Sequence, residues 1–307
     1  MLGRRLGVVV VTALLGCGSS AVSGDCEGLP AEQCGQPDAG LPDGGAPLES
    51  ELVVDTDWLE ARLGDPDIQL IDTRATGYGV SRIPGAIHLR PAELAAIVEG
   101  IPDQVMPPME AEQVLRAAGL RNEVTAVVYG EAPEYDPSRI VWALRYYGHD
   151  DVRYLDGGFA AWAAAQGALD TDPPITESTQ YTIVGVNEDL RVTGDWVLLQ
   201  LVDAPYDMPA IQLVDARSEG EYTDGHIPSA RSVNWTRNLD GGFFGSKREL
   251  EALYDGMNPA ETTVSYCTTG LRGSFAWLTL TALGFEDARL YDGSWNEWGS
   301  GEFPVEQ

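Results

Sequence analysis

Histidine and cysteine are scarce in this 307-residue chain, which has three of the former and four of the latter. They are too few and too scattered for a zinc-cluster protein or a disulfide-built scaffold. Cations are scarce too, because 19 Lys and Arg stand against 48 Asp and Glu, for a net charge of −29. Binding to nucleic acid or to an anionic membrane surface needs clustered cations, so we expect neither.

Apolar residues, by contrast, are plentiful. They make up 44% of the chain, while only 22% of the residues are charged, so most of the chain is expected to fold around a core. At about 150 residues per domain, the length predicts two domains.

The first 16 residues are predicted to be a signal peptide. Arg4 and Arg5 give a positive start, and the apolar run 6–15 that follows is too short to span a bilayer. The segment 14–17 resembles a bacterial lipobox, in which cleavage makes an acylated cysteine the first residue. We therefore expect an exported lipoprotein, anchored through Cys17 to the outer membrane or the periplasmic face. The alternative is an ordinary secretory signal in which Cys17 has no role.

Residues 17–48 are predicted to be a flexible tether. Gly, Pro, Asp and Ser dominate this segment, and such a composition buries no core. Cys26 and Cys34 lie within it and could form a disulfide after export, although the sequence does not decide whether they do.

The remainder of the chain repeats itself in the same order at a spacing of roughly 140 residues, which indicates a duplicated domain. The matching segments are 71–74 with 214–217, 125–130 with 262–267, and 155–159 with 291–295. Two prolines at 173–174 mark the boundary. We predict a first domain over 49–172, a linker over 173–188 and a second domain over 189–307.

Each half alternates short apolar strands with helical patterns, which predicts an α/β fold with a parallel sheet covered by helices on both faces. Predicted strands are 68–71, 124–129, 212–214 and 262–266. Apolar residues at helical spacing mark one helix face around Ile140 and another around Phe275.

Asp72 and Asp215 end strands just before Arg74 and Arg217, and we expect buried ion pairs there.

The chemistry is concentrated at Cys267, which follows a predicted strand. The glycines at 270 and 273 let the loop N–H groups converge on one point, and a helix is expected to begin near Ser274. Both the N–H groups and the helix N-terminus favour a thiolate, and a thiolate is a nucleophile. The alternative is an inert buried cysteine. The candidate substrate-binding residues are Thr268, Thr269, Gly270, Leu271 and Arg272.

These motifs together resemble the tandem-domain rhodanese family of thiosulfate and 3-mercaptopyruvate sulfurtransferases, over residues 50–307. The resemblance implies two rhodanese-like domains and a persulfide on Cys267, which takes sulfur from a small-molecule donor and passes it to a thiol or cyanide. It implies no metal or organic cofactor. Only the second domain should be catalytic, because Gly130 stands where the repeat would place a cysteine.

Several residues bear on the donor. Thr268 and Thr269 stand where thiosulfate-preferring relatives have cations, and Thr269 could replace a serine of the mercaptopyruvate enzymes. Glu221 falls where many relatives have a substrate-binding arginine, which favours a persulfide or polysulfide donor. Arg82 could steer an anion in the cleft, and Trp295 could line its mouth.

Two other function classes stay open. One is a non-enzymatic sulfur carrier or binding module on the same scaffold. The other is a cysteine phosphatase or arsenate reductase. Such enzymes generally place five residues between cysteine and arginine, and here four lie between Cys267 and Arg272, which suits a single sulfur atom better than a tetrahedral oxyanion. The sequence does not indicate an oligomeric state.

Overall fold

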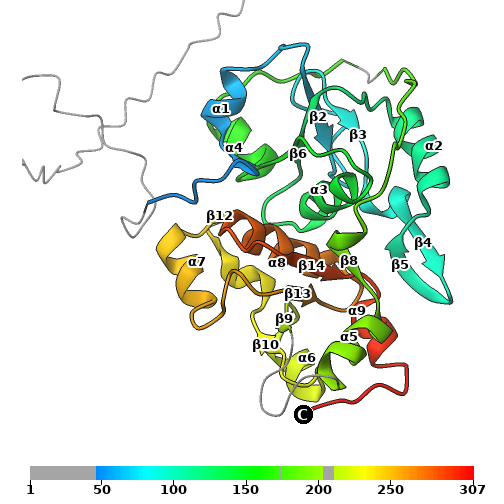
Figure 1. Cartoon of the computed structure of the whole chain (residues 1–307). Helices are drawn as coiled ribbons and strands as arrows, with labels where there is room; N and C mark the ends of the chain where they lie inside the picture. The colour runs from blue at the N-terminus through cyan, green and yellow to red at the C-terminus, as the bar shows by residue number, and fades with distance from the viewer. Residues whose placement is uncertain (1–45, 173–174, 203–210) are drawn as a thin grey trace, which may run out of the picture. The chain divides into compact units, whose positions relative to one another are not determined.

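A computed structural model of the chain describes residues 46–172, 175–202 and 211–307 (Figure 1). The predicted signal peptide, Cys17, and the pair Cys26 and Cys34 lie outside the described residues. All described elements belong to the unit Gly45–Gln307. None of its described helices is both long and apolar enough to cross a membrane.

Each half of this unit contains a five-stranded sheet, and every strand pairing in the two sheets is parallel. The first sheet has the order β1-β7-β6-β2-β3, with bounds β1 Val53–Val54, β2 Ile68–Asp72, β3 Ile87–His88, β6 Thr125–Tyr129 and β7 Val152–Leu155. The second has the order β8-β14-β13-β9-β10, with bounds β8 Arg191–Val192, β9 Gln212–Asp215, β10 Arg231–Ser232, β13 Thr263–Tyr266 and β14 Ala288–Tyr291. The two orders are equivalent, so the duplicated parallel fold is confirmed.

Helices surround both sheets, and each half adds one antiparallel hairpin. The α-helices are α1 Thr56–Glu60, α2 Pro108–Ala118, α3 Asp136–Tyr146, α4 Gly158–Ala164, α5 Gly194–Val202, α6 Glu219–Asp224, α7 Lys247–Leu253, α8 Leu271–Ala282 and α9 Ser294–Trp298. The hairpins join β4 Ala95–Val98 to β5 Ile101–Val105, and β11 Leu239–Asp240 to β12 Phe243–Phe244. Short 3-10 turns are η1 Pro91–Leu94, η2 Glu188–Leu190 and η3 Trp235–Asn238.

Both faces of each sheet are buried. Leu70 and Ile71 are neighbours in β2 but enter different core clusters, as Leu213 and Val214 do in β9. Side chains alternate across a strand, so this split places apolar residues on both sides of the sheet. It explains why these strands are continuous apolar runs.

Helices α3 and α8 join the two halves. They pack against each other, and the Ser138 and Ser274 hydroxyls lie 3.0 Å apart. Trp142 and Trp277 belong to the same core cluster. The sequence predicted one apolar face per helix, but nearly all of α3 is buried because it lies between its own sheet and α8.

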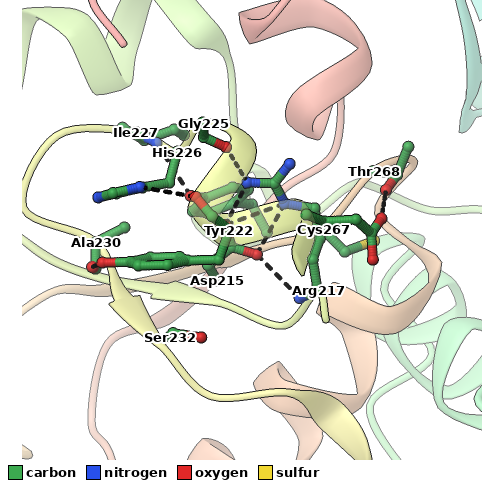
Figure 2. Close-up of polar contacts among 12 residues, drawn as sticks. Asp215, Arg217, Tyr222, Gly225, His226, Ile227, Ala230, Ser232, Cys267 and Thr268 are labelled. Carbon is green, nitrogen blue, oxygen red and sulfur yellow. Dashed lines mark hydrogen bonds and ion pairs between the residues drawn. The ribbon is translucent and has the colours of Figure 1, made fainter. Parts of the chain in front are cut away.

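The repeat extends to individual hydrogen bonds. The guanidinium of Arg74 binds the Asp72 carboxylate at 2.6 Å, and Arg217 binds Asp215 at the same distance. All four side chains are buried, so the predicted ion pairs are confirmed. In the second half, Arg217 also donates to the Gly225 carbonyl at 2.7 Å (Figure 2).

The segments that flank the domains are held by hydrogen bonds. Leu48, in the last part of the predicted tether, is only 9% exposed, and the Ala46 carbonyl accepts the Lys247 N–H. Residues 175–187 of the predicted linker contain no helix or strand. They cross the first half, where the Thr179 N–H donates to the Arg116 carbonyl at 3.0 Å.

Asp156, directly after β7, predicts a pH dependence of stability. Burial raises the pKa of Asp156 to about 6, although the Phe244 and Gly157 N–H groups partly offset this by donating to its carboxylate. In the unfolded chain, Asp156 releases its proton at about pH 4. The protonated side chain therefore stabilises the fold at low pH, and this stabilisation is lost as the pH rises toward 6.

The Asp156→Asn variant should isolate this effect, because asparagine is neutral at every pH. Urea unfolding at a series of pH values gives the difference in the free energy of unfolding between the wild type and the variant. As the pH rises from 4 to 6, the wild type should lose stability relative to the variant, and above pH 6 the difference should stay constant. A difference that does not change with pH would contradict the assignment.

Candidate functional site

The loop that carries Cys267 connects β13 to α8 at the carboxyl end of the second sheet. Helix α8 begins at Leu271, three residues before the predicted start at Ser274, which corrects that expectation. Gly270 adopts a left-handed conformation with φ +80°, and its carbonyl accepts the Ser274 N–H at 2.9 Å. Arg272 therefore lies in the first helical turn, with its side chain directed by the helix.

Helix α9 holds the loop from outside. The Trp295 and Asn296 N–H groups donate to the Cys267 and Thr268 carbonyls at 2.9 and 3.0 Å, and the Cys267 N–H donates to Ser294 Oγ at 3.2 Å. No described residue accepts a hydrogen bond from the backbone N–H groups of residues 268–270. Three donors in the cysteine loop are therefore available for an anion, as the predicted nest requires.

Cys267 is fully buried, and Arg272 is the cation associated with it. Two neighbours raise the pKa of Arg272 despite its partial burial: hydrogen bonding to Glu221 is the larger cause, and the Cys267 sulfur adds to it. The guanidinium is thus charged at all working pH values and lies between the sulfur and a carboxylate.

That carboxylate belongs to Glu221 in the first turn of α6. Arg272 Nη1 and Nη2 each donate to Glu221 at 2.8 Å, in the two-pronged geometry that makes such pairs strong. The Thr268 hydroxyl also donates to Glu221, at 3.1 Å. The hydrogen bond from Arg272, aided by Ser218, keeps the pKa of Glu221 well below its usual range, so the carboxylate stays ionised.

The other predicted loop residues are partly accessible. Thr269 and Leu271 are both half-buried. Within the described ranges, the Thr269 hydroxyl has no hydrogen-bond partner. Thr269 can therefore contact a ligand, whereas the Thr268 hydroxyl already has partners.

Arg82 is paired within the first half, and its role in steering an anion in the cleft stays a prediction. Its side chain is only 6% exposed and is bound to the Asp170 carboxylate at 2.6 Å. It also donates to the Asp172 carbonyl at 2.8 Å. These partners lie at the end of the first half, and they already satisfy the charge that was expected to attract a donor.

Trp295 supports the loop. Its N–H holds the Cys267 carbonyl, and its ring lies 4.3 Å from the Arg217 guanidinium, a cation–π distance. Arg217 in turn lies beside Asp215 near Cys267 (Figure 2). These contacts connect the repeated ion pair, Arg217 with Asp215, to the cysteine loop through one aromatic ring.

In the described part of the first half, no cysteine stands at the position equivalent to Cys267. Gly130 occupies the position that corresponds to Cys267, and its carbonyl accepts the Phe159 N–H as that of Cys267 accepts the Trp295 N–H. A Cβ atom there would lie 2.7 Å from Pro137 Cγ and 2.8 Å from Thr73 Oγ1. Those contacts are too close, so this packing admits glycine alone.

The first half instead reaches the cysteine loop through a buried cluster around Asp292, a residue to which the sequence had assigned no role. The Asp292 carboxylate binds Arg139 at 2.6 Å and Arg191 at 3.2 Å, and accepts the Val105 N–H at 2.8 Å. A Cβ at Gly270 would lie 3.0 Å from the Asp292 carbonyl oxygen, so the loop rests closely against this cluster. The repeated Asp-Gly motif was its only signal in the sequence.

Comparisons with known proteins agree with this architecture. The rhodanese-like domain matches residues 55–165 and again residues 198–300. The thiosulfate sulfurtransferase of Corynebacterium glutamicum is 31% identical over 271 residues, covering 81% of this chain and 88% of that protein. The sulfur carrier protein TtuD of Thermus thermophilus is 30% identical over 275 residues, covering 81% and 94%.

Among solved structures, the crystal structure of SseA from Escherichia coli is similar, and its description concerns 3-mercaptopyruvate sulfotransferases. The TM-score is 0.72 at 25% identity, over 80% of this chain and 99% of that chain.

Proposed function

The chain belongs to the rhodanese family and is a sulfurtransferase, and on this premise we propose that Cys267 is the residue that carries the transferred sulfur as a persulfide. The observation that supports this most strongly is the cysteine loop itself. It surrounds a buried thiol with three unengaged N–H groups and one arginine.

In the first step, the Cys267 thiolate attacks the outer sulfur of the donor. With a persulfide RS–SH, the sulfur–sulfur bond breaks, RS⁻ leaves and takes a proton from water, and Cys267 retains an S–SH group. With thiosulfate, the same attack leaves a Cys267 S–S⁻ group and releases sulfite. The N–H groups of residues 268–270 are suited to stabilise charge on the outer sulfur, because preorganised backbone donors need no rearrangement during the step.

In the second step, an acceptor removes the outer sulfur. A thiolate attacks it, forms a new persulfide, and returns Cys267 to the thiolate state. Arg272, charged throughout, favours that thiolate as leaving group. A thiol or cyanide fits this role, and no proton donor within the loop is required.

A non-enzymatic sulfur carrier is the second candidate. The relative named as a sulfur carrier and the neutralisation of Arg272 by Glu221 both favour it. Turnover discriminates between the two. A sulfurtransferase converts many equivalents of donor when a thiol acceptor is in excess, whereas a carrier stops after one sulfur per Cys267.

We also propose that the protein is a lipoprotein of the cell envelope, anchored through Cys17, with its domains outside the cytoplasmic membrane. The support is the signal-like segment 1–16 and the lipobox-like residues before Cys17. A diacyl anchor would hold the domains at a membrane with no spanning helix.

The anchor predicts a specific localisation result. In a bacterial host, the wild-type chain should fractionate with membranes and give a mature mass that begins at an acylated Cys17. The Cys17→Ser variant should lose both properties, whereas Cys26→Ser, as the matched control, should keep them. A soluble mature wild-type chain that starts elsewhere would contradict the lipoprotein proposal.

A further inference from the structure

We propose that Glu221 determines which donor the enzyme accepts: it engages the side-chain donors of the cysteine loop, so the site takes a persulfide that leaves as a thiol and disfavours thiosulfate. This inference rests on the proposed function, because it concerns the donor that loads Cys267. It assigns Glu221 a specificity role in that reaction.

The position of the Glu221 carboxylate is fixed by its own helix. Ser218 and Glu221 form a reciprocal cap at the start of α6, in which the Ser218 N–H donates to Glu221 Oε2 at 3.0 Å and the Ser218 hydroxyl donates at 2.7 Å. The carboxylate also accepts both Arg272 bonds and the Thr268 bond. Moving the carboxylate to admit another anion would break several of these hydrogen bonds at once, which is energetically unfavourable.

The same contacts occupy several of the side-chain donors of the cysteine loop that a substrate could otherwise use. Both Arg272 terminal nitrogens donate to Glu221, and Nη2 also donates to Thr268 Oγ1 at 2.6 Å. Thr268 has one hydroxyl proton, and it is directed to Glu221. Beside Cys267 there remain the backbone N–H groups of residues 268–270, the Thr269 hydroxyl and an Arg272 N–H directed to the Cys267 sulfur, and the charge of that guanidinium is already paired with Glu221.

This set of donors suits one sulfur anion but not two anionic groups. After attack on thiosulfate, the site must hold a persulfide anion beside the sulfite dianion, and their repulsion needs cations nearby. After attack on a persulfide, it holds a neutral S–SH group and one thiolate that water protonates. Because the charge of Arg272 is already balanced by Glu221, the site offers little net positive charge for a second anion, and a persulfide donor fits it better than thiosulfate.

Glu221→Gln tests the assignment with little risk to the fold, because glutamine at this helical position can keep the cap with Ser218. Glu219→Gln is the matched control. Glu219 is an exposed residue of the same helical turn, and its carboxylate accepts a hydrogen bond from the Ser232 hydroxyl at 3.3 Å rather than from the cysteine loop. The Glu219→Gln substitution removes the same charge from the same helix as Glu221→Gln does.

The measurement is kcat/KM for sulfur transfer from thiosulfate and from 2-hydroxyethyl persulfide to excess thiol, in the full mature chain. In the wild type, we expect the persulfide to exceed thiosulfate by about tenfold or more. Glu221→Gln should raise the ratio of kcat/KM for thiosulfate to kcat/KM for the persulfide by about tenfold. Glu219→Gln should change neither.

Two results would overturn the inference while leaving the proposed function in place. One is equal use of both donors by the wild type. The other is a parallel fall of both rates in Glu221→Gln, which would show that Glu221 only positions the loop. Failure of Cys267 to gain sulfur from either donor would instead overturn the proposed function, and this inference with it.

Discussion

Replacing Cys267 by serine is expected to lower kcat/KM for sulfur transfer by at least about a thousandfold, because the variant lacks the nucleophile that forms the covalent intermediate. A serine hydroxyl is not ionised near neutral pH and does not attack sulfane sulfur as a thiolate does. The fold should be unaffected, since serine is nearly isosteric and the surrounding loop is held by backbone bonds to α9.

The matched control applies the same substitution to two other cysteines, Cys26 and Cys34. A variant with Cys26→Ser and Cys34→Ser should keep kcat/KM within about twofold of the wild type, because Cys267 is the one cysteine in the described residues. Sulfur transfer by Cys267→Ser at a rate near the wild type would show that another residue carries the sulfur. Circular dichroism of both variants verifies that they are folded.

Replacing Asp292 by alanine is expected to lower the free energy of unfolding by about 3–5 kcal/mol, the cost of breaking a buried ion pair on one side only. The Asp292 side chain is fully buried, and its loss leaves the buried Arg139 and the largely buried Arg191 without their carboxylate. The Val105 N–H also loses its acceptor. Since these partners come from both halves, the variant should weaken their junction and loosen the loop at Gly270.

Urea unfolding followed by tryptophan fluorescence measures this loss. Glu251→Ala is the control, because it removes the exposed Lys247–Glu251 pair of α7, and such pairs contribute at most about 1 kcal/mol. An Asp292→Ala variant as stable as Glu251→Ala would contradict the view that the Asp292 cluster holds the two halves together.

The fold could be predicted from the sequence because the evidence for it is local and occurs twice. Runs such as 68–71 and 212–214 are apolar on both faces of the strand, and their repetition at one spacing indicates the duplication. The cysteine loop was predictable for a similar reason. The cysteine, the two glycines and the arginine that shape it lie within seven consecutive residues.

What could not be predicted depends on contacts between distant segments. Arg82 looked free in the sequence, but its partner Asp170 lies 88 positions away. Asp292 binds Arg139 across 153 positions. The all-round burial of α3 follows from α8, and nothing in the periodicity of α3 reveals a second helix packed against it.

Glu221 lies between these cases. Its position after Ser218 indicates a helix cap, and the sequence placed it in the candidate cleft. Its pairing with Arg272 spans 51 positions and appears only in the folded chain. In the folded chain, this pairing balances the charge of Arg272, which is the physical reason why the site is expected to disfavour anionic donors.

Intact mass spectrometry tests most directly whether Cys267 carries the transferred sulfur. The reduced mature chain is incubated with a persulfide donor, with thiosulfate and with 3-mercaptopyruvate, beside Cys267→Ser. A gain of one sulfur atom in the wild type, absent in the variant and reversed by a thiol, is the predicted result. No gain with any donor, in protein whose Cys267 is shown to be reduced and alkylatable, would contradict it.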